Sequence, residues 1–167
     1  ATVNTAGSST SLNSSEQVLK IKSTLYEATL STVGGGSFTE YVLIPDGTNK
    51  YLGGYTNEGL YQDSSNVSLI LNHQAKCAPC VGIIYDGVSM VLEQPFTLKK
   101  NVALSLDKAF IINEGDSLVL NTEHVDSRFI INKQTTFFSD SFTTKHFVTA
   151  QDLKGGLEQI YLIWDKG

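Results

Sequence analysis

The fold is decided by one stretch, Phe110-Ile111-Ile112-Asn113-Glu114-Gly115-Asp116-Ser117-Leu118-Val119-Leu120. Three apolar residues lead into a cluster of turn residues, in which Gly115 can adopt a positive φ at little cost. From Ser117 onward leucine occupies every second position, which is the period of a strand. The stretch therefore predicts a strand, a tight turn and a second strand.

The segments on either side of this stretch repeat the pattern. Apolar residues alternate at Val102, Leu104 and Leu106 before it. After it, Phe129-Ile130-Ile131 follows a polar connection that runs from Asn121 to Arg128. Consecutive strands usually lie next to one another in space, so we expect a β-meander.

Gly115-Asp116-Ser117-Leu118 also spells the block that names one family of serine esterases. In those enzymes the serine lies near the start of the chain, between a strand and a helix, and an Asp-x-x-His block near the C-terminus supplies the base. Here no helical pattern follows the block, and no Asp-x-x-His occurs. A serine hydroxyl needs a base within hydrogen-bond reach to attack a carbonyl. The sequence therefore favours a turn that leads into a strand.

The N-terminal part of the chain predicts an arm followed by strands. Residues 1–15 are almost wholly Ala, Thr, Ser, Asn and Gly and cannot bury enough apolar surface to offset their ordering entropy. We expect a flexible arm, either without a role or ordered against a partner subunit. The segment from Glu16 to Leu30 could pass for an amphipathic helix, but its β-branched and aromatic residues favour a strand. Gly34-Gly35-Gly36 then predicts a turn into a strand from Phe38 to Ile44.

The middle of the chain predicts three more strands. Apolar residues alternate at Val67, Leu69 and Leu71. Further along, the strands expected at Val81–Tyr85 and Val88–Leu92 flank an Asp-Gly pair, which is a strong hairpin signal.

The C-terminal part predicts two strands around a short helical turn. We expect a strand from Phe142 to Ala150 and a single helical turn at Gln151–Lys154, which two glycines end. The segment Ile160–Trp164 is too apolar for a solvated tail. It predicts a strand that docks in the sheet or at a subunit interface.

Taken together, these signals indicate an all-β protein. About ten short strands, with turn signals roughly every 8 to 12 residues, are typical of an antiparallel β-sandwich or a jelly-roll-like fold. One domain is expected for 167 residues, and we place it at residues 16–167. A chain of this length buries roughly 70% of its unfolded surface and needs no disulfide or metal to fold.

Composition limits the partners of the chain. Charged residues make up only 17% of it, and the net charge is −5. A single arginine, Arg128, and the Lys99-Lys100 pair cannot form the basic stripe that phosphate neutralisation requires. No apolar run approaches the roughly 20 residues of a membrane span, and the N-terminus lacks the features of a signal peptide. We therefore expect neither nucleic acid nor membrane as a partner.

Cys77-Ala78-Pro79-Cys80 has three interpretations. A redox pair of the thioredoxin type needs a helix after the motif to lower the pKa of a thiol, and none is predicted. Structural zinc needs four ligands, and His73 is the only further candidate nearby. The third interpretation, which we prefer, is two free thiols or a local disulfide in a hairpin loop.

Tyrosines and glycines alternate between Thr48 and Ser65. Tyr51, Tyr55 and Tyr61 lie among three glycines there. A tyrosine ring offers a flat apolar face and a polar tip, which suits surfaces that bind sugars or proteins. The same residues could equally form the rim of a sandwich core.

No catalytic constellation is predicted. His73, His124 and His146 lie in three different contexts among polar neighbours, and such histidines are usually surface or hydrogen-bonded residues. Carboxylates do not pair, no phosphate-binding loop occurs, and the single arginine leaves no obvious anion clamp. We therefore predict no catalytic residue, no cofactor-binding residue and no metal ligand.

The run from Asn66 to Ile131, 66 of the 167 residues, resembles small β-sandwich structural proteins of tailed bacteriophage virions. The alternating strand at Val67–Leu71 precedes a hairpin strand, and a polar-apolar stretch follows at Asn101–Lys108. An apolar strand then leads through Glu-Gly-Asp into an alternating strand at Phe110–Leu120, before Arg128-Phe129-Ile130-Ile131. The resemblance implies structural work in the head, tail or baseplate, commonly as trimers or other homo-oligomers, and it carries over no functional residue.

The expected function is therefore that of a non-enzymatic virion protein, specifically a head decoration (cementing) protein that binds other virion proteins. The polar arm, the low charge and the apolar C-terminal segment suit a chain that works by assembly. The alternative is a carbohydrate- or receptor-binding β-sandwich, either a phage tail module or a secreted lectin. Its glycan site would be the loop with Tyr51, Tyr55 and Tyr61.

Overall fold

The computed structural model describes residues 15–44, 54–55, 60–62, 77–99 and 109–164. These residues form thirteen β-strands and no helix. Neighbouring strands are antiparallel except for one pair, β1 and β9, and none of the described sheets closes into a barrel. The predicted all-β class is confirmed. The predicted arm lies outside the described residues except for Ser15, and the predicted strand at residues 67–71 lies outside them entirely.

The strands belong to four sheets. In chain order they are β1 (Val18–Lys22), β2 (Tyr26–Ser31), β3 (Ser37–Leu43), β4 (Gly54–Tyr55), β5 (Tyr61–Gln62), β6 (Cys80–Tyr85), β7 (Val88–Val91), β8 (Thr97–Leu98), β9 (Phe110–Ile111), β10 (Ser117–Val125), β11 (Phe129–Phe138), β12 (Thr144–Asp152) and β13 (Leu157–Ile163). Two four-stranded sheets have the orders β3-β2-β1-β9 and β12-β11-β10-β8. A three-stranded sheet has the order β13-β6-β7, and β4 pairs with β5 alone.

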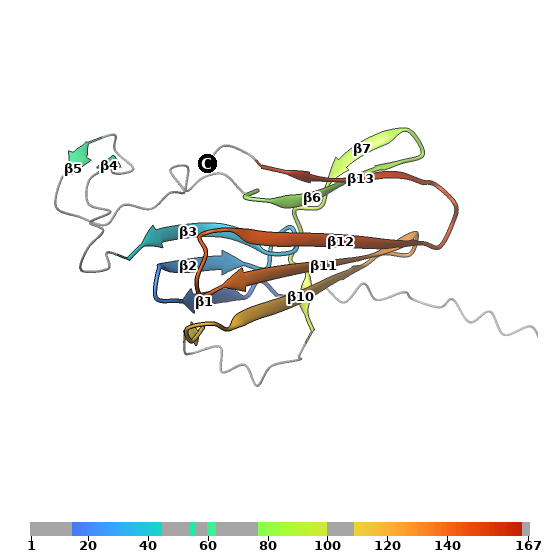
Figure 1. The fold of residues 1–167 in the computed structure, drawn as a ribbon. Helices are drawn as coiled ribbons and strands as arrows, with labels where there is room; N and C mark the ends of the chain where they lie inside the picture. The colour runs from blue at the N-terminus through green and yellow to red at the C-terminus, as the bar shows by residue number, and fades with distance from the viewer. Residues whose placement is uncertain (1–14, 45–53, 56–59, 63–76, 100–108, 165–167) are drawn as a thin grey trace, which may run out of the picture.

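The sheet β12-β11-β10-β8, here called the shared sheet, packs against both other large sheets (Figure 1). Along β11 every second side chain is buried, which is the period of a strand with one face on a core. Phe137 belongs to a core with β1, β2 and β3, whereas Phe129 and Ile131 belong to a second core with β6. One strand therefore contributes to both cores.

Each core is made mainly of large apolar side chains. The first contains Leu19, Ile21, Tyr26, Ala28, Leu30, Phe38, Tyr41, Ala78, Ile112, Leu120 and Phe137. The second contains Val81, Ile83, Tyr85, Leu92, Phe96, Phe129 and Ile131. Burying one such side chain fully contributes about 1.5–3 kcal/mol, so packing in the two cores is the main source of stability.

The stretch from Phe110 to Leu120 forms the predicted strand, turn and strand, but it does not form a hairpin. The amide of Asp116 donates to the carbonyl of Asn113, and Gly115 has a φ of 80°. β9 pairs with β1, however, and β10 pairs with β11 and β8. The turn thus joins two facing sheets, and in this part of the chain the antiparallel meander consists of β10, β11 and β12.

The polar connection expected from Asn121 to Arg128 is wrong in extent. β10 continues to Val125, so only residues 126–128 connect it to β11. Polar residues occupy both faces of this part of the strand, and the buried Thr122 is satisfied because it donates its hydroxyl hydrogen to the carbonyl of Gly35 at 3.0 Å. The predicted alternation at Val102, Leu104 and Leu106 lies outside the described residues.

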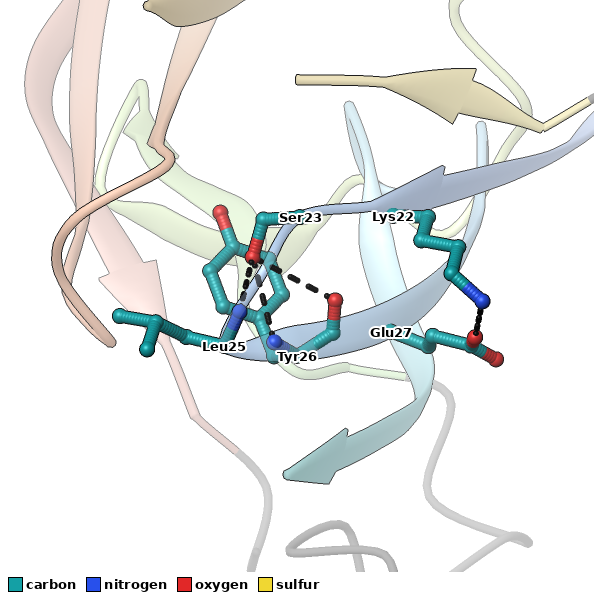
Figure 2. A network of polar contacts seen from close by, with 5 residues as sticks. All are labelled: Lys22, Ser23, Leu25, Tyr26 and Glu27. Carbon is teal, nitrogen blue, oxygen red and sulfur yellow. Dashed lines mark hydrogen bonds and ion pairs between the residues drawn. The ribbon is translucent and has the colours of Figure 1, made fainter. Parts of the chain in front are cut away.

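The single strand expected from Glu16 to Leu30 is instead a hairpin of β1 and β2. Ser23 interrupts it because its Oγ accepts hydrogen bonds from the amides of Leu25 and Tyr26, both at 3.1 Å (Figure 2). A serine hydroxyl that bonds the backbone two or three residues ahead stabilises a turn.

The helical turn expected at Gln151–Lys154 is also wrong. β12 runs through Asp152, whose carboxylate accepts hydrogen bonds from the amides of Lys154, Gly155 and Leu157. This network closes a turn in place of a helix, and Gly155 allows it with a φ of 82°.

Three other predictions are confirmed. The triple-glycine turn joins β2 to β3, and all three glycines have positive φ. Asp86 and Gly87, with φ of 47° and 74°, join β6 to β7. The apolar C-terminal segment forms β13, which pairs with β6 in the sheet.

Candidate functional site

The tyrosines of the predicted binding loop are only partly described. Tyr51 lies outside the described residues. Tyr55 of β4 and Tyr61 of β5 lie directly opposite each other in an antiparallel pair, and the Tyr61 side chain is 61% exposed. The structure therefore places two of the three predicted residues opposite each other on paired strands.

Cys77 and Cys80 are joined by a disulfide, with 4.7 Å between their Cα atoms. They are 4% and 0% exposed, and strand β6 begins at Cys80 where a thioredoxin-type pair would have a helix. His73 lies outside the described residues. Within the described ranges, no group of three or more His, Cys, Asp or Glu side chains is placed to hold a metal ion.

The disulfide lies next to the triple-glycine turn. Gly34 packs directly on Cys80, and a Cβ at Gly35 would lie 2.9 Å from Cδ of Lys133. Three carbonyls of the turn accept hydrogen bonds from other elements: Gly34 from the amide of Val81, Gly35 from Thr122 and Gly36 from Lys133. We call this region, made of Gly34–Gly36, Cys77–Cys80, Thr122 and Lys133, the buried junction. It connects all three large sheets.

Lys133 is the charged residue of the buried junction. Its side chain is 1% exposed, and its Nζ donates to the carbonyl oxygens of Gly36 at 3.0 Å and Pro79 at 2.8 Å. Within the described part of the chain, no carboxylate forms an ion pair with it. Burial lowers the pKa of this amine to about 7 because the charged form loses its hydration.

Sequence reasoning missed Lys133, although a signal was present. In the run from Phe129 to Phe138, Lys133 is in phase with Phe129, Ile131 and Phe137. A two-residue period therefore places it on the buried face.

The two described histidines, His124 and His146, are each more than half buried and are packed or hydrogen-bonded within the fold. His146 shares hydrogen bonds with the hydroxyls of Thr135 at 3.2 Å and Thr144 at 3.1 Å. Burial, with a further contribution from the nearby Lys133 charge, lowers the pKa of His146 to about 4. His124 stacks on Phe96, and burial lowers its pKa as well. Both histidines are therefore held as neutral packing residues near pH 7.

An open groove of about 610 Å³ lies beside the turn between β1 and β2. Its wall includes the ion pair of Lys22 and Glu27, which Figure 2 shows on the outer side of the hairpin, and the apolar Val42, Ile44 and Ile111. Lys22 and Glu27 neutralise each other, but Glu114 also lines the groove, which therefore presents a net negative charge to a ligand.

The outer edge of β12 is the described surface best suited to another polypeptide. β12 ends the shared sheet, and no described strand pairs with its second edge. Phe147 points outward from this nine-residue strand and is 64% exposed, and Phe142 and Leu153 are exposed just beyond its two ends. An edge strand presents unpaired N–H and C=O groups to which a further chain can bind.

Comparison of the chain with protein-family models, with curated proteins and with solved structures gave no match. The described residues also include no helix that is long and apolar enough to cross a membrane. Any function therefore has to be argued from the fold and its surfaces.

Proposed function

We propose that the chain is a structural protein of a tailed-bacteriophage virion, specifically a head decoration protein that assembles as a homo-oligomer, in particular a trimer. The observation that carries the proposal is the long edge strand β12 with its outward Phe147. A cementing protein acts by non-covalent contact, and an open edge flanked by apolar side chains provides such a contact.

Three further features support this function. The interior consists of two apolar cores and the buried junction between the sheets, so the fold is a rigid scaffold for its surfaces. The sequence pattern from Asn66 to Ile131 resembles that of phage virion proteins, as described above. β13 also ends its sheet among the described strands, and Leu162 on this strand and Trp164 just after it are exposed, which offers a second contact surface.

The test uses phage particles stripped of this protein. Wild-type protein, Phe147→Lys and Val88→Lys are each mixed with the particles, and co-sedimentation is measured. Val88 is the matched control because it is 59% exposed on β7, which ends a different sheet. We expect Phe147→Lys to weaken binding at least tenfold and Val88→Lys to retain it. Equal binding by all three proteins would exclude β12 as the contact, and no binding by the wild type would exclude decoration.

A second candidate function is binding of carbohydrate or a receptor, as a tail module or a lectin. It is favoured by the position of Tyr55 opposite Tyr61 and by the exposure of Tyr61. An array of bacterial surface glycans would be probed with wild-type protein and with Tyr61→Ala. Binding that the substitution abolishes would support this function, whereas an array without signal would remove it.

A further inference from the structure

The disulfide loop holds one of the two acceptors on which Lys133 depends. Pro79 lies between Cys77 and Cys80, and its carbonyl oxygen is 2.8 Å from Nζ of Lys133. The carbonyl of Gly36 is the other acceptor. Because the amine is 1% exposed, a lost acceptor would not readily be replaced by bulk water.

The position of the loop is set from both sides. The amide of Ala78 donates to Oγ of Ser37 at 2.6 Å, and the carbonyl of Ala78 accepts from the amide of Phe38 at 2.8 Å. These bonds attach the loop to β3, while the disulfide closes it onto the start of β6. The Pro79 carbonyl is therefore fixed toward Lys133 by the disulfide and by β3 together.

We propose that the Cys77–Cys80 disulfide is a redox latch for the buried junction. When it is closed, the Pro79 carbonyl is held on Lys133. When it is reduced, the loop gains freedom, the carbonyl moves away, and the amine is left buried with one acceptor fewer. A chain that folds in oxidising surroundings, with the disulfide closed, is thus more stable than one that folds reduced. This inference concerns the fold and does not rest on the proposed function.

The chemistry is thiol–disulfide exchange with a dithiol. The S–S bond breaks, the two cysteines take up two electrons and two protons as thiols, and the dithiol closes to its cyclic disulfide. Both sulfur-bearing residues are buried, so exchange requires the chain to open. The redox state is therefore set when the chain folds.

A disulfide across so short a loop gains little from chain entropy, because that gain grows with the number of residues enclosed. Any large effect of reduction must then come from the contacts of the loop. Coupling to Lys133 can be measured separately, because a methionine at position 133 has a similar length and no amine.

The experiment is a thermodynamic cycle on the full chain that combines two changes, reduction of the disulfide and the substitution Lys133→Met. Wild type and Lys133→Met are unfolded in guanidinium chloride, with or without dithiothreitol, and thiol titration verifies the redox state. Each is then refolded under the same condition, and denaturant titration gives the folding equilibrium constant. We expect reduction to lower this constant about tenfold more in wild type than in Lys133→Met, the effect of one unsatisfied buried donor. An equal loss in both proteins would overturn the proposal.

A second measurement needs no substitution, should Lys133→Met fail to fold. The lysine Cε resonances of wild type are recorded in the oxidised and the reduced protein by NMR. The Lys133 resonance should shift on reduction, whereas that of Lys22, which lies on the surface with Glu27, should not. An unchanged Lys133 resonance would overturn the latch.

Discussion

Lys22 and Lys133 place the same side chain in opposite surroundings. Lys22 lies half exposed at the end of β1 and pairs with Glu27 of β2. Lys133 lies in the middle of β11, 1% exposed, and its amine bonds only to backbone carbonyls among the described residues. A surface ion pair contributes about 0–1 kcal/mol, whereas a buried amine affects every element that surrounds it. The contrast teaches that position along the strand period, and not residue type, decides what a lysine does here.

The same contrast separates the inside of the molecule from its outside. At the buried junction, each carbonyl of the triple-glycine turn receives a hydrogen bond from another element. At the outer edge of β12, no described strand receives the backbone groups. The carbonyls of the buried turn are thus satisfied within the described residues, whereas the edge is where a partner could bind.

The largest expected difference is between the variants that remove the Lys133 and the Lys22 side chains. Lys133→Ala should lower the free energy of unfolding by about 3–5 kcal/mol, because it leaves a cavity and two buried carbonyls without a donor. Lys22→Ala should lower it by less than about 1 kcal/mol. Denaturant titration of both variants measures the difference. Similar small losses would mean that Lys133 is not the centre of the interior.

A smaller effect is expected at two glycines with positive φ. Gly35→Ala should cost about 2–4 kcal/mol, because the new Cβ would meet Lys133 and Phe96 in addition to the strained φ of 85°. Gly87→Ala has a similar φ of 74° but open space around the Cβ, so it should cost about 1–2 kcal/mol. Thermal unfolding of the two variants compares them. Equal costs would show that the junction tolerates an added methyl group.

The pH dependence of the free energy of unfolding should also report the buried Lys133. The pKa of Lys133 is about 7 in the folded chain and about 10.4 when unfolded. Between these values the unfolded state binds more protons, so the free energy of unfolding should rise with pH, by up to about 1.4 kcal/mol per unit.

Denaturant titrations from pH 7 to pH 9.5 would measure this slope. They avoid the region below pH 6.5 where His146, with its folded pKa of about 4, adds a rise of its own. They also avoid high pH, where the raised pKa values of Tyr26 and Tyr41 make stability fall as the unfolded tyrosines ionise. Lys133→Met should lose the slope, and a slope that persists in this variant would contradict its assignment to Lys133.

Much of the fold could be predicted from local signals. A glycine triplet and an Asp-Gly pair marked the turns at Gly34–Gly36 and Asp86-Gly87, because glycine adopts positive φ at little cost. Alternation marked the strands. Pairing could not be predicted, because β9 and β10 adjoin one tight turn and yet lie in different sheets. The sheet to which β9 belongs depends on the pairing of Phe110 with β1, and these two segments are distant in sequence.

The candidate site was less predictable. The tyrosines and cysteines stood out by type and spacing, whereas Lys133 appeared as an ordinary polar residue until its phase in β11 was known. The β12 edge carries no motif, since an open edge is defined by the absence of a neighbouring strand in the described sheet and not by a residue pattern.

The most direct test of the proposed function is to locate the protein on a phage particle. Purified chain would be added back to stripped particles and imaged by cryo-electron microscopy. The proposal predicts added density at regular positions on the head shell, with the β12 edge at the contact. Density confined to the tail tip, or no density together with a positive glycan array, would contradict decoration and favour the tyrosine-bearing strands β4 and β5.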